Sequence, residues 1–176
     1  ARQVIALLFT DIVDSTALFG SLGLDRADAV RRDHDHAVVG AVTRAGGTVV
    51  KHTGDGIMAS FSGPSAAVGA QRAVERTASR HQVVLAIRAG IALGEATEED
   101  GDWFSPPVVE ASRLCSAASA GAILVSDRGL AMSAIDVGVT SIGPLGLKGI
   151  DHPAPAIAWG EGKAAERTAS AITGVA

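Results

Sequence analysis

The chain has 176 residues, enough for one domain that buries roughly 70% of the surface exposed by its unfolded form. Apolar residues make up 47% and aromatic residues only 3%, so the core must consist mainly of Ala, Val, Ile and Leu. The net charge of −4 argues against a broad nucleic-acid interface, which would require a basic face, and we expect no nucleic-acid partner.

Cysteine content and hydropathy predict the cellular setting. Cys115 is the only cysteine, which excludes an intrachain disulfide and favours a reducing, cytoplasmic location. No apolar run approaches the roughly 18 residues of a membrane span, so no membrane segment is expected in this chain. The stretch before Asp11 is too short for a secretory signal. Because Ala1 directly precedes a predicted strand, the chain is expected to be cut from a longer protein.

The first half of the chain predicts a strand followed by a helix. Residues 4–9 form a continuous apolar run, the pattern of a strand that is buried on both faces. A helix start follows at residues 14–16, and residues 25–45 carry apolar side chains at helical spacing up to a Gly-Gly stop. His34 and His36 stand two positions apart, on different sides of this helix. We therefore predict a solvated face there rather than a metal site.

A β-hairpin is predicted next, with an acidic tip. Strand-like residues 48–51 and 57–61 bracket Thr53-Gly54-Asp55-Gly56, and glycines supply the positive φ that tight turns need. Such Asp-Gly tips commonly have no chemistry, and Asp11 and Asp14 are also suited to capping a helix start. If the first strand lies beside the hairpin, however, Asp11 and Asp55 converge at one end of the sheet. Two carboxylates there can bind hard divalent cations through oxygen.

The second half predicts two further helices and several strands. The expected elements are a helix over 64–80, a strand over 83–93, an acidic loop over 95–102, a helix over 108–118, a strand over 122–126, a short helix from Asp127, and weaker strands over 137–142 and 157–159. Residues 1–160 are predicted to form the domain, and residues 161–176 a frayed tail or an expression remnant.

The order strand, helix, hairpin, helix, strand predicts an α+β fold. We expect a ferredoxin-like βαββαβ core with additional C-terminal strands and a helix. The sheet should be antiparallel at its centre, with helices covering one face.

Five motifs in this order resemble the catalytic domain of the class III nucleotidyl cyclases, in its bacterial branch. The resemblance covers nearly the whole chain, from Val4 to Trp159. The motifs are Phe9-Thr10-Asp11-Ile12, Lys51-His52-Thr53-Gly54-Asp55-Gly56, Arg88-Ala89-Gly90-Ile91-Ala92-Leu93-Gly94-Glu95, the stretch from Asp102 to Arg113, and Leu147-Lys148-Gly149.

The resemblance implies a role for each matching position. Asp11 and Asp55 would bind two Mg²⁺ or Mn²⁺ ions per site, with the backbone carbonyl of Ile12 as a further ligand. Lys51 and Asp102 would read adenine. Arg113 would stabilise the transition state, and Lys148 would hold the polyphosphate. The family forms a head-to-tail dimer whose sites take the metal aspartates from one chain and the base-reading residues from the other.

One position departs from the family pattern. The family's transition-state asparagine falls on Val109, which cannot donate a hydrogen bond. The main prediction is a homodimeric adenylyl cyclase that converts ATP to 3′,5′-cyclic AMP and pyrophosphate. The alternatives are a catalytically weak nucleotide-binding regulatory module and a dimerisation domain without a ligand. Judged alone, Lys51 and Arg113 also suit ordinary surface positions.

Overall fold

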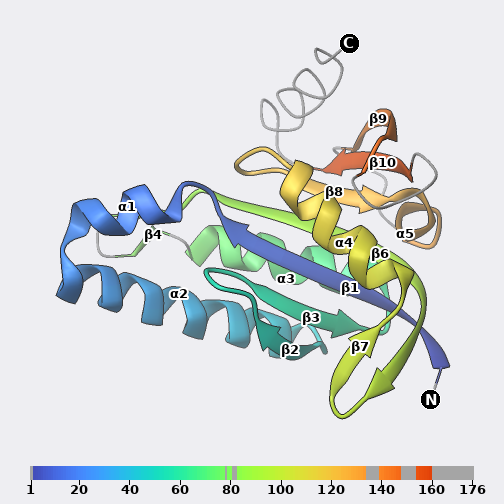
Figure 1. Cartoon of the computed structure of the whole chain (residues 1–176), viewed down its shortest axis with the longest axis horizontal. Helices are drawn as coiled ribbons and strands as arrows, with labels where there is room; N and C mark the ends of the chain where they lie inside the picture. The colour runs from blue at the N-terminus through green and yellow to red at the C-terminus, as the bar shows by residue number, and fades with distance from the viewer. Residues whose placement is uncertain (1, 78, 81–82, 134–138, 148–153, 160–176) are drawn as a thin grey trace.

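A computed structural model of the chain describes residues 2–77, 79–80, 83–133, 139–147 and 154–159 (Figure 1). Its elements in chain order are β1 (Arg2–Ile12), α1 (Ser15–Leu22), α2 (Leu24–Arg44), β2 (Thr48–His52), β3 (Ile57–Phe61), α3 (Pro64–Thr77), β4 (Ser79–Arg80), β5 (Val83–Val84), β6 (Ile87–Glu99), β7 (Asp102–Phe104), α4 (Pro106–Ala117), β8 (Ile123–Ser126), α5 (Asp127–Ala131), β9 (Val139–Leu145) and β10 (Ala154–Trp159).

The main sheet has eight strands, and β1 lies near its middle. The strand order is β2-β3-β1-β6-β8-β10-β9, and β7 pairs with the far end of β6. β1 is antiparallel to both β3 and β6, whereas β6 and β8 run parallel. A mixed α and β fold around a largely antiparallel sheet is thus confirmed. The ferredoxin-like description of its core stays a prediction.

Both faces of β1 are buried, as its continuous apolar run predicts. Ala6 and Leu8 belong to a core formed with α2 and α3, while Ile5 and Leu7 belong to a second core formed with α4. Alternate side chains of a strand point to opposite faces, so each face of this strand needs its own cover. The expectation that helices cover only one face is therefore wrong: α4 lies on one side of the sheet, and α2 and α3 on the other (Figure 1).

The helix α4 approaches the sheet unusually closely at Gly90. A Cβ atom at this position of β6 would lie 2.2 Å from the Cys115 backbone N and 2.3 Å from the Ala111 backbone O. Glycine alone leaves room for helix backbone at that distance. This contact fixes the height of α4 above the strands that carry the candidate site.

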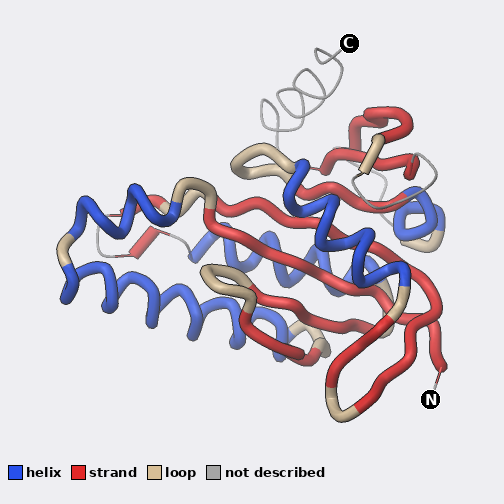
Figure 2. Tube along the Cα trace, viewed as in Figure 1, coloured by secondary structure: helices blue, strands red, loops and turns tan. Residues whose placement is uncertain are grey.

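Two predictions for residues 83–102 are wrong. The expected single strand is divided into β5 and β6 by Leu85 and Ala86, which belong to neither strand; the Ala86 carbonyl accepts a 2.8 Å hydrogen bond from the Val13 N–H instead. The expected acidic loop is mostly strand, since β6 continues to Glu99 and pairs with β7. Asp100 and Gly101, with φ of 51° and 81°, form the turn of this hairpin (Figure 2).

The predicted solvated face of α2 is also wrong at one position. His34 is only 5% exposed, and its neighbours at helical spacing, Val30 and Val38, belong to the core shared with α3. His36, two residues on, is exposed as predicted. The charged residues at positions 31–36 suggested a fully solvated face, although His34 among them is buried.

Candidate active site

The tip of the β2–β3 hairpin lies directly against the end of β1. Gly54 has φ 79°, and the Thr53 N–H donates a 2.9 Å hydrogen bond to the Gly56 carbonyl. A Cβ on Gly56 would lie 1.7 Å from the Thr10 carbonyl oxygen and 3.1 Å from the Asp11 Cα. The structure therefore brings Asp55, the neighbour of Gly56, to the end of β1 that carries Asp11.

Asp11 forms an ion pair with Arg88, its cross-strand partner on β6. The Arg88 Nε and Nη2 atoms donate to Asp11 Oδ2 at 3.0 and 2.7 Å, and Nη1 donates to the Ser116 carbonyl of α4 at 3.0 Å. Arg88 has no predicted role from the sequence motifs. The available signal was register: antiparallel pairing of the two strands places opposite charges directly across from each other.

Asp55 accepts a hydrogen bond from the hydroxyl of Ser15, the first residue of α1. Ser15 is buried, and the preceding Asp14 adopts a left-handed conformation, φ 54°, that turns the chain from β1 into the helix. The charge of this carboxylate also affects the pKa of His34 on α2. Burial lowers the pKa of His34, although the charges of Asp35 and Asp55 act in the opposite direction.

Lys51 and Asp102 form a second polar pair, which joins β2 to β7. The Lys51 ammonium donates to Asp102 Oδ2, and the Trp103 N–H donates to Oδ1 at 2.8 Å. The hydrogen bond from Lys51 is the main reason that the pKa of Asp102 lies below its usual value. The two side chains are 45% and 31% exposed, so both remain accessible to a ligand.

The helix α4 carries Arg113 and Val109, one turn apart. The Nε atom of Arg113 is buried and has no hydrogen-bond partner among the described residues. Val109 is 43% exposed. Lys148, the predicted polyphosphate ligand, and the predicted tail over 161–176 lie outside the described residues.

The residues around Asp11 and Asp55 suit a hard divalent cation. In the described part of the chain, no three His, Cys, Asp or Glu side chains are grouped to hold a metal. Mg²⁺, however, is typically bound by one or two carboxylates and completes its shell with water and substrate phosphates. Asp11 and the carbonyl of Ile12 at the end of β1, together with Asp55 on the adjacent hairpin, could supply oxygen ligands of this kind.

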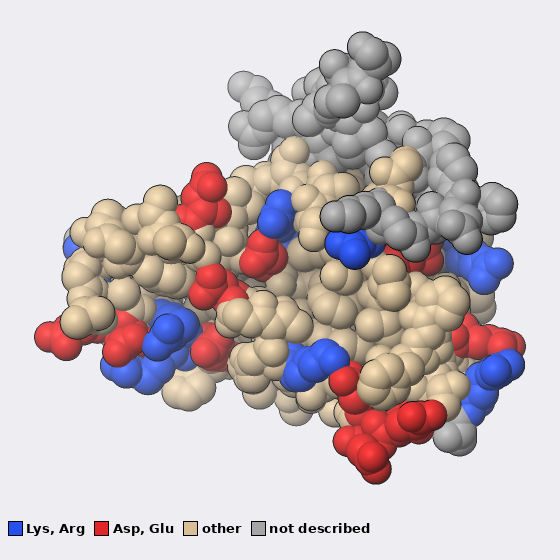
Figure 3. Space-filling view, in the orientation of Figure 1, with Lys and Arg blue, Asp and Glu red and all other residues tan. Residues whose placement is uncertain are grey.

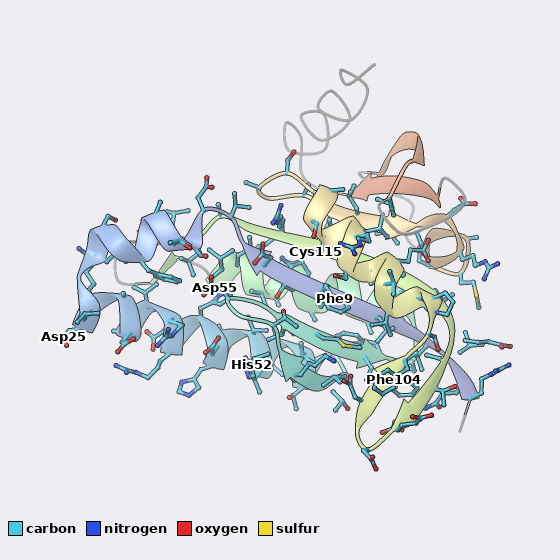
Figure 4. The ribbon with its side chains drawn as sticks, in the orientation of Figure 1. Phe9, Asp25, His52, Asp55, Phe104 and Cys115 are labelled. Carbon is cyan, nitrogen blue, oxygen red and sulfur yellow. The ribbon has the colours of Figure 1, made fainter. Side chains whose placement is uncertain are left out.

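Two residues of the β2–β3 hairpin make polar contacts on different sides: Asp55 contacts Ser15 of α1, and Lys51 contacts Asp102 of β7. Asp55 lies at the hairpin tip, near the start of α1, whereas Phe104, two residues beyond Asp102, lies toward the opposite end of the molecule (Figure 4). Exposed Glu98, Glu99 and Asp100 gather beyond it at the β6–β7 turn (Figure 3).

Two other features lie apart from the candidate residues. Burial raises the pKa of the Cys115 thiol to about 12, so this cysteine is not a thiolate nucleophile at neutral pH. A pocket of about 380 Å³ lies between β6 and the start of α4, and none of the candidate residues lines it. Its wall includes Glu110. Burial raises the pKa of this carboxyl, and the charge of Arg128 acts in the opposite direction.

Comparisons with known proteins identify the family. No protein-family model matches the sequence. An uncharacterized protein of Mycobacterium tuberculosis is 34% identical over 145 residues, which is 82% of this chain but only 38% of that protein's length. The crystal structure of an adenylate/guanylate cyclase/hydrolase from Silicibacter pomeroyi is 29% identical, with a TM-score of 0.75 over 90% of this chain and 97% of that one. The chain belongs to the class III nucleotidyl cyclase catalytic domains.

Further matches include cyclases of both base specificities. The adenylyl cyclase CyaB from P. aeruginosa has a TM-score of 0.78 at 24% identity, over 90% of this chain and 94% of that one. The guanylate cyclase domain of RhGC from Catenaria anguillulae, solved with GTP, has a TM-score of 0.79 at 18% identity, over 90% and 97%. Such identities show the fold alone. A pH-sensitive adenylate cyclase of M. tuberculosis is 51% identical over 41 residues, or 23% of this cyclase domain and 10% of that protein.

No helix in the described part of the domain is both long and apolar enough to cross a membrane.

Proposed function

We propose that this domain is an adenylyl cyclase that converts ATP to 3′,5′-cyclic AMP and pyrophosphate. The observation that carries the choice of ATP is the pairing of Lys51 with Asp102, residues 51 positions apart in the chain that meet at one accessible surface. An ammonium beside a carboxylate matches the edge of adenine, which offers a ring nitrogen as acceptor and a 6-amino group as donor. Guanine presents O6 at the latter position, where it would face Asp102 with repulsion.

The reaction is an in-line displacement at the α-phosphorus of ATP. The ribose 3′-oxygen forms a bond to phosphorus as its proton leaves, and the bond to the bridging oxygen of pyrophosphate breaks. Divalent cations, when bound at Asp11 and Asp55, would neutralise the polyphosphate and acidify the attacking hydroxyl. Arg113 would contribute fixed positive charge where negative charge develops. Lys148 would hold the departing pyrophosphate.

Arg88 holds the Asp11 carboxylate in position through an ion pair. Its guanidinium contacts one oxygen of Asp11 twice and leaves the other without a hydrogen bond among the described residues. Its third contact, to Ser116, ties this carboxylate to the end of α4, the helix that carries Arg113. The metal-binding and transition-state residues are thereby joined through one side chain.

We further propose that the active unit is a head-to-tail homodimer with two shared sites. Within one chain, Asp55 is directed to α1 and Lys51 to β7, although both belong to one hairpin. A two-fold partner can bring the Lys51–Asp102 pair of one chain to the carboxylates of the other. Exposed apolar side chains at Phe104 and Val109, beside the base-reading pair and Arg113, suit an interface of this kind.

The direct test is incubation of the domain with MnCl₂ and either ATP or GTP, followed by mass spectrometry of the nucleotides. We expect cyclic AMP and pyrophosphate in equal amounts and much less cyclic GMP. Asp55→Asn should abolish both products while leaving the circular dichroism spectrum unchanged. Product formation by this variant at the wild-type rate would remove Asp55 from the metal site.

Val109 favours a second candidate, a nucleotide-binding module with weak turnover. Its exposed isopropyl group offers no hydrogen bond at a position where the family supplies an asparagine amide. Under this alternative the domain binds ATP with Mn²⁺, but cyclic AMP does not accumulate above the Asp55→Asn background. Val109→Asn should then create measurable turnover.

A further inference from the structure

The only hydrogen bond to the Asp55 carboxylate among the described residues comes from the Ser15 hydroxyl. Ser15 lies 40 positions earlier in the chain, at the start of a different element, and it is 9% exposed. The N-cap position of α1 is occupied by Asp14, so Ser15 is not the residue that caps this helix. Here the hydroxyl donates across the structure to a candidate metal ligand instead.

Hydrogen bonds and close contacts hold the backbone on both sides of the Ser15–Asp55 hydrogen bond. The Val13 N–H donates a 2.8 Å hydrogen bond to the Ala86 carbonyl, and Asp14 turns sharply with φ 54°. On the other side, Gly56 contacts the Thr10 backbone, and the Ile57 N–H donates to Thr10 Oγ1 at 3.2 Å. Donor and acceptor therefore lie on two separate segments, and both are anchored at the end of β1. The hydrogen bond sets the rotation of a carboxylate whose backbone is already in place.

We infer that Ser15 is a positioning residue for divalent-cation binding at Asp55. This inference rests on the proposed function. A carboxylate with one oxygen bound to a hydroxyl donor presents its second oxygen in a fixed direction, which reduces the cost of ordering it when a cation binds. Partners that orient metal ligands in this way typically contribute 10–100-fold to metal affinity or activity. The role belongs to the hydroxyl group, not to the helix start as such.

The inference predicts a selective loss of metal affinity. Ser15→Ala should raise the free Mn²⁺ concentration needed for half-saturation by about tenfold or more. The kcat at saturating Mn²⁺ should stay close to that of the wild type, because no reacting atom contacts Ser15. Ser15→Thr retains the hydroxyl and should restore wild-type metal affinity. A purely structural role would instead lower stability without separating metal affinity from kcat.

The experiment measures Mn²⁺ binding by the electron paramagnetic resonance signal of the free ion, in the presence of 3′-deoxy-ATP. This analogue lacks the attacking hydroxyl, so binding is read without turnover; Mn²⁺ dependence of cyclic AMP production is measured in parallel. Ser21→Ala is the matched control, because Ser21 lies on the same helix and its hydroxyl bonds only the exposed Leu18 carbonyl, at 2.7 Å. Ser15→Cys, of similar volume but with a weak donor, replaces the alanine variant if that one does not fold.

The outcomes separate this inference from the proposed function. Weaker Mn²⁺ binding by Ser15→Ala, with Ser15→Thr and Ser21→Ala unchanged, supports the inference even if the wild type makes no cyclic nucleotide, a result that would defeat only the proposed function. Wild-type Mn²⁺ affinity in Ser15→Ala overturns the inference and leaves the function intact. Absence of Mn²⁺ binding by the wild type overturns both.

Discussion

At the scale of single residues, the Lys51–Asp102 pair makes a prediction about nucleotide choice. Both side chains are partly exposed, and such pairs contribute only about 0–1 kcal/mol to stability. Replacing both residues with alanine should therefore leave unfolding nearly unchanged. The preference for ATP over GTP is measured as a ratio of kcat/KM values. The free-energy difference that corresponds to this ratio should fall by at most a few kcal/mol, the scale of one or two hydrogen bonds.

Arg31 and Asp28 provide the control for this double substitution. They form another exposed ion pair, at 2.8 Å on α2, a helix that carries neither Lys51 nor Asp102. Replacing both with alanine should leave the ATP preference unaltered. Equal use of ATP and GTP by the wild type would show that the assignment of Lys51 and Asp102 is incorrect.

His34 predicts how stability depends on pH. Burial lowers its pKa in the folded state, so the unfolded chain binds a proton at this residue before the folded chain does. The stabilising contribution is complete above the ordinary pKa near 6.5 and is lost as pH falls toward the lowered folded value. For one proton, the slope cannot exceed about 1.4 kcal/mol per pH unit.

Urea unfolding at a series of pH values between 7.5 and 5 measures this slope. His34→Gln should flatten the acid side of the stability curve. His36→Gln, an exposed substitution two residues away on α2, should leave it unchanged. An identical pH dependence in the wild type and His34→Gln would mean that His34 titrates alike in both states.

Sequence reasoning found the residues that stand in motifs and missed those that act through packing. Asp55 and Lys51 were identified from a hairpin motif and a family resemblance, and both hold polar contacts in the structure. Arg88 contacts Asp11 through the register of β1 against β6, and Ser15 contacts Asp55 through the turn after β1. Neither the register nor the turn was part of the motifs that the sequence analysis used. His34 was misassigned because the charges around it conceal the apolar spacing of Val30 and Val38.

At the scale of elements, the seating of the hairpin on β1 depends on Gly56. A methyl group there would overlap the Thr10 carbonyl, an atom that cannot move without disturbing β1. Gly56→Ala should lower the free energy of unfolding by about 1–3 kcal/mol, the usual cost of overpacking, and weaken Mn²⁺ binding. Thermal and urea unfolding measure the first effect, and Mn²⁺ titration the second.

Gly69 on α3 is the matched control. It is exposed, and a Cβ there would contact nothing within 4 Å. Because alanine is the better helix former, Gly69→Ala should stabilise the domain by up to about 1 kcal/mol. A Gly56→Ala domain as stable as Gly69→Ala would contradict the close contact between hairpin and strand.

Element type was predictable wherever periodicity was strong, and element boundaries were not. The β1 run, the β2–β3 hairpin and the helices α2, α3 and α4 all follow from local pattern. The acidic residues 95–102 resembled a loop because Ala96 is their only apolar side chain. They nevertheless extend β6 into a hairpin with β7, since pairing with a neighbouring strand outweighs intrinsic preference.

At the scale of the whole molecule, the account requires two chains for each active site. Asp11 and Asp55 would act in one site of the dimer, and Lys51 of the same chain in the other. Activity per chain should therefore fall on dilution if the interface is weak. Analytical ultracentrifugation shows at which dilutions the dimer dissociates. A specific activity that stays constant across those dilutions would argue for a self-contained monomer.

Mixing two inactive variants tests this shared site most directly. Asp55→Ala and Lys51→Ala, each nearly inactive alone, are combined under conditions that allow subunit exchange. In a mixed dimer one site collects both substitutions and the other is intact. With random pairing about half of the dimers are mixed, so roughly a quarter of wild-type cyclic AMP production should return. Mixing Asp55→Ala with Asp11→Ala should restore nothing, because each site then lacks one metal carboxylate. Absence of recovery in the first mixture, despite demonstrated subunit exchange, would contradict the shared-site account.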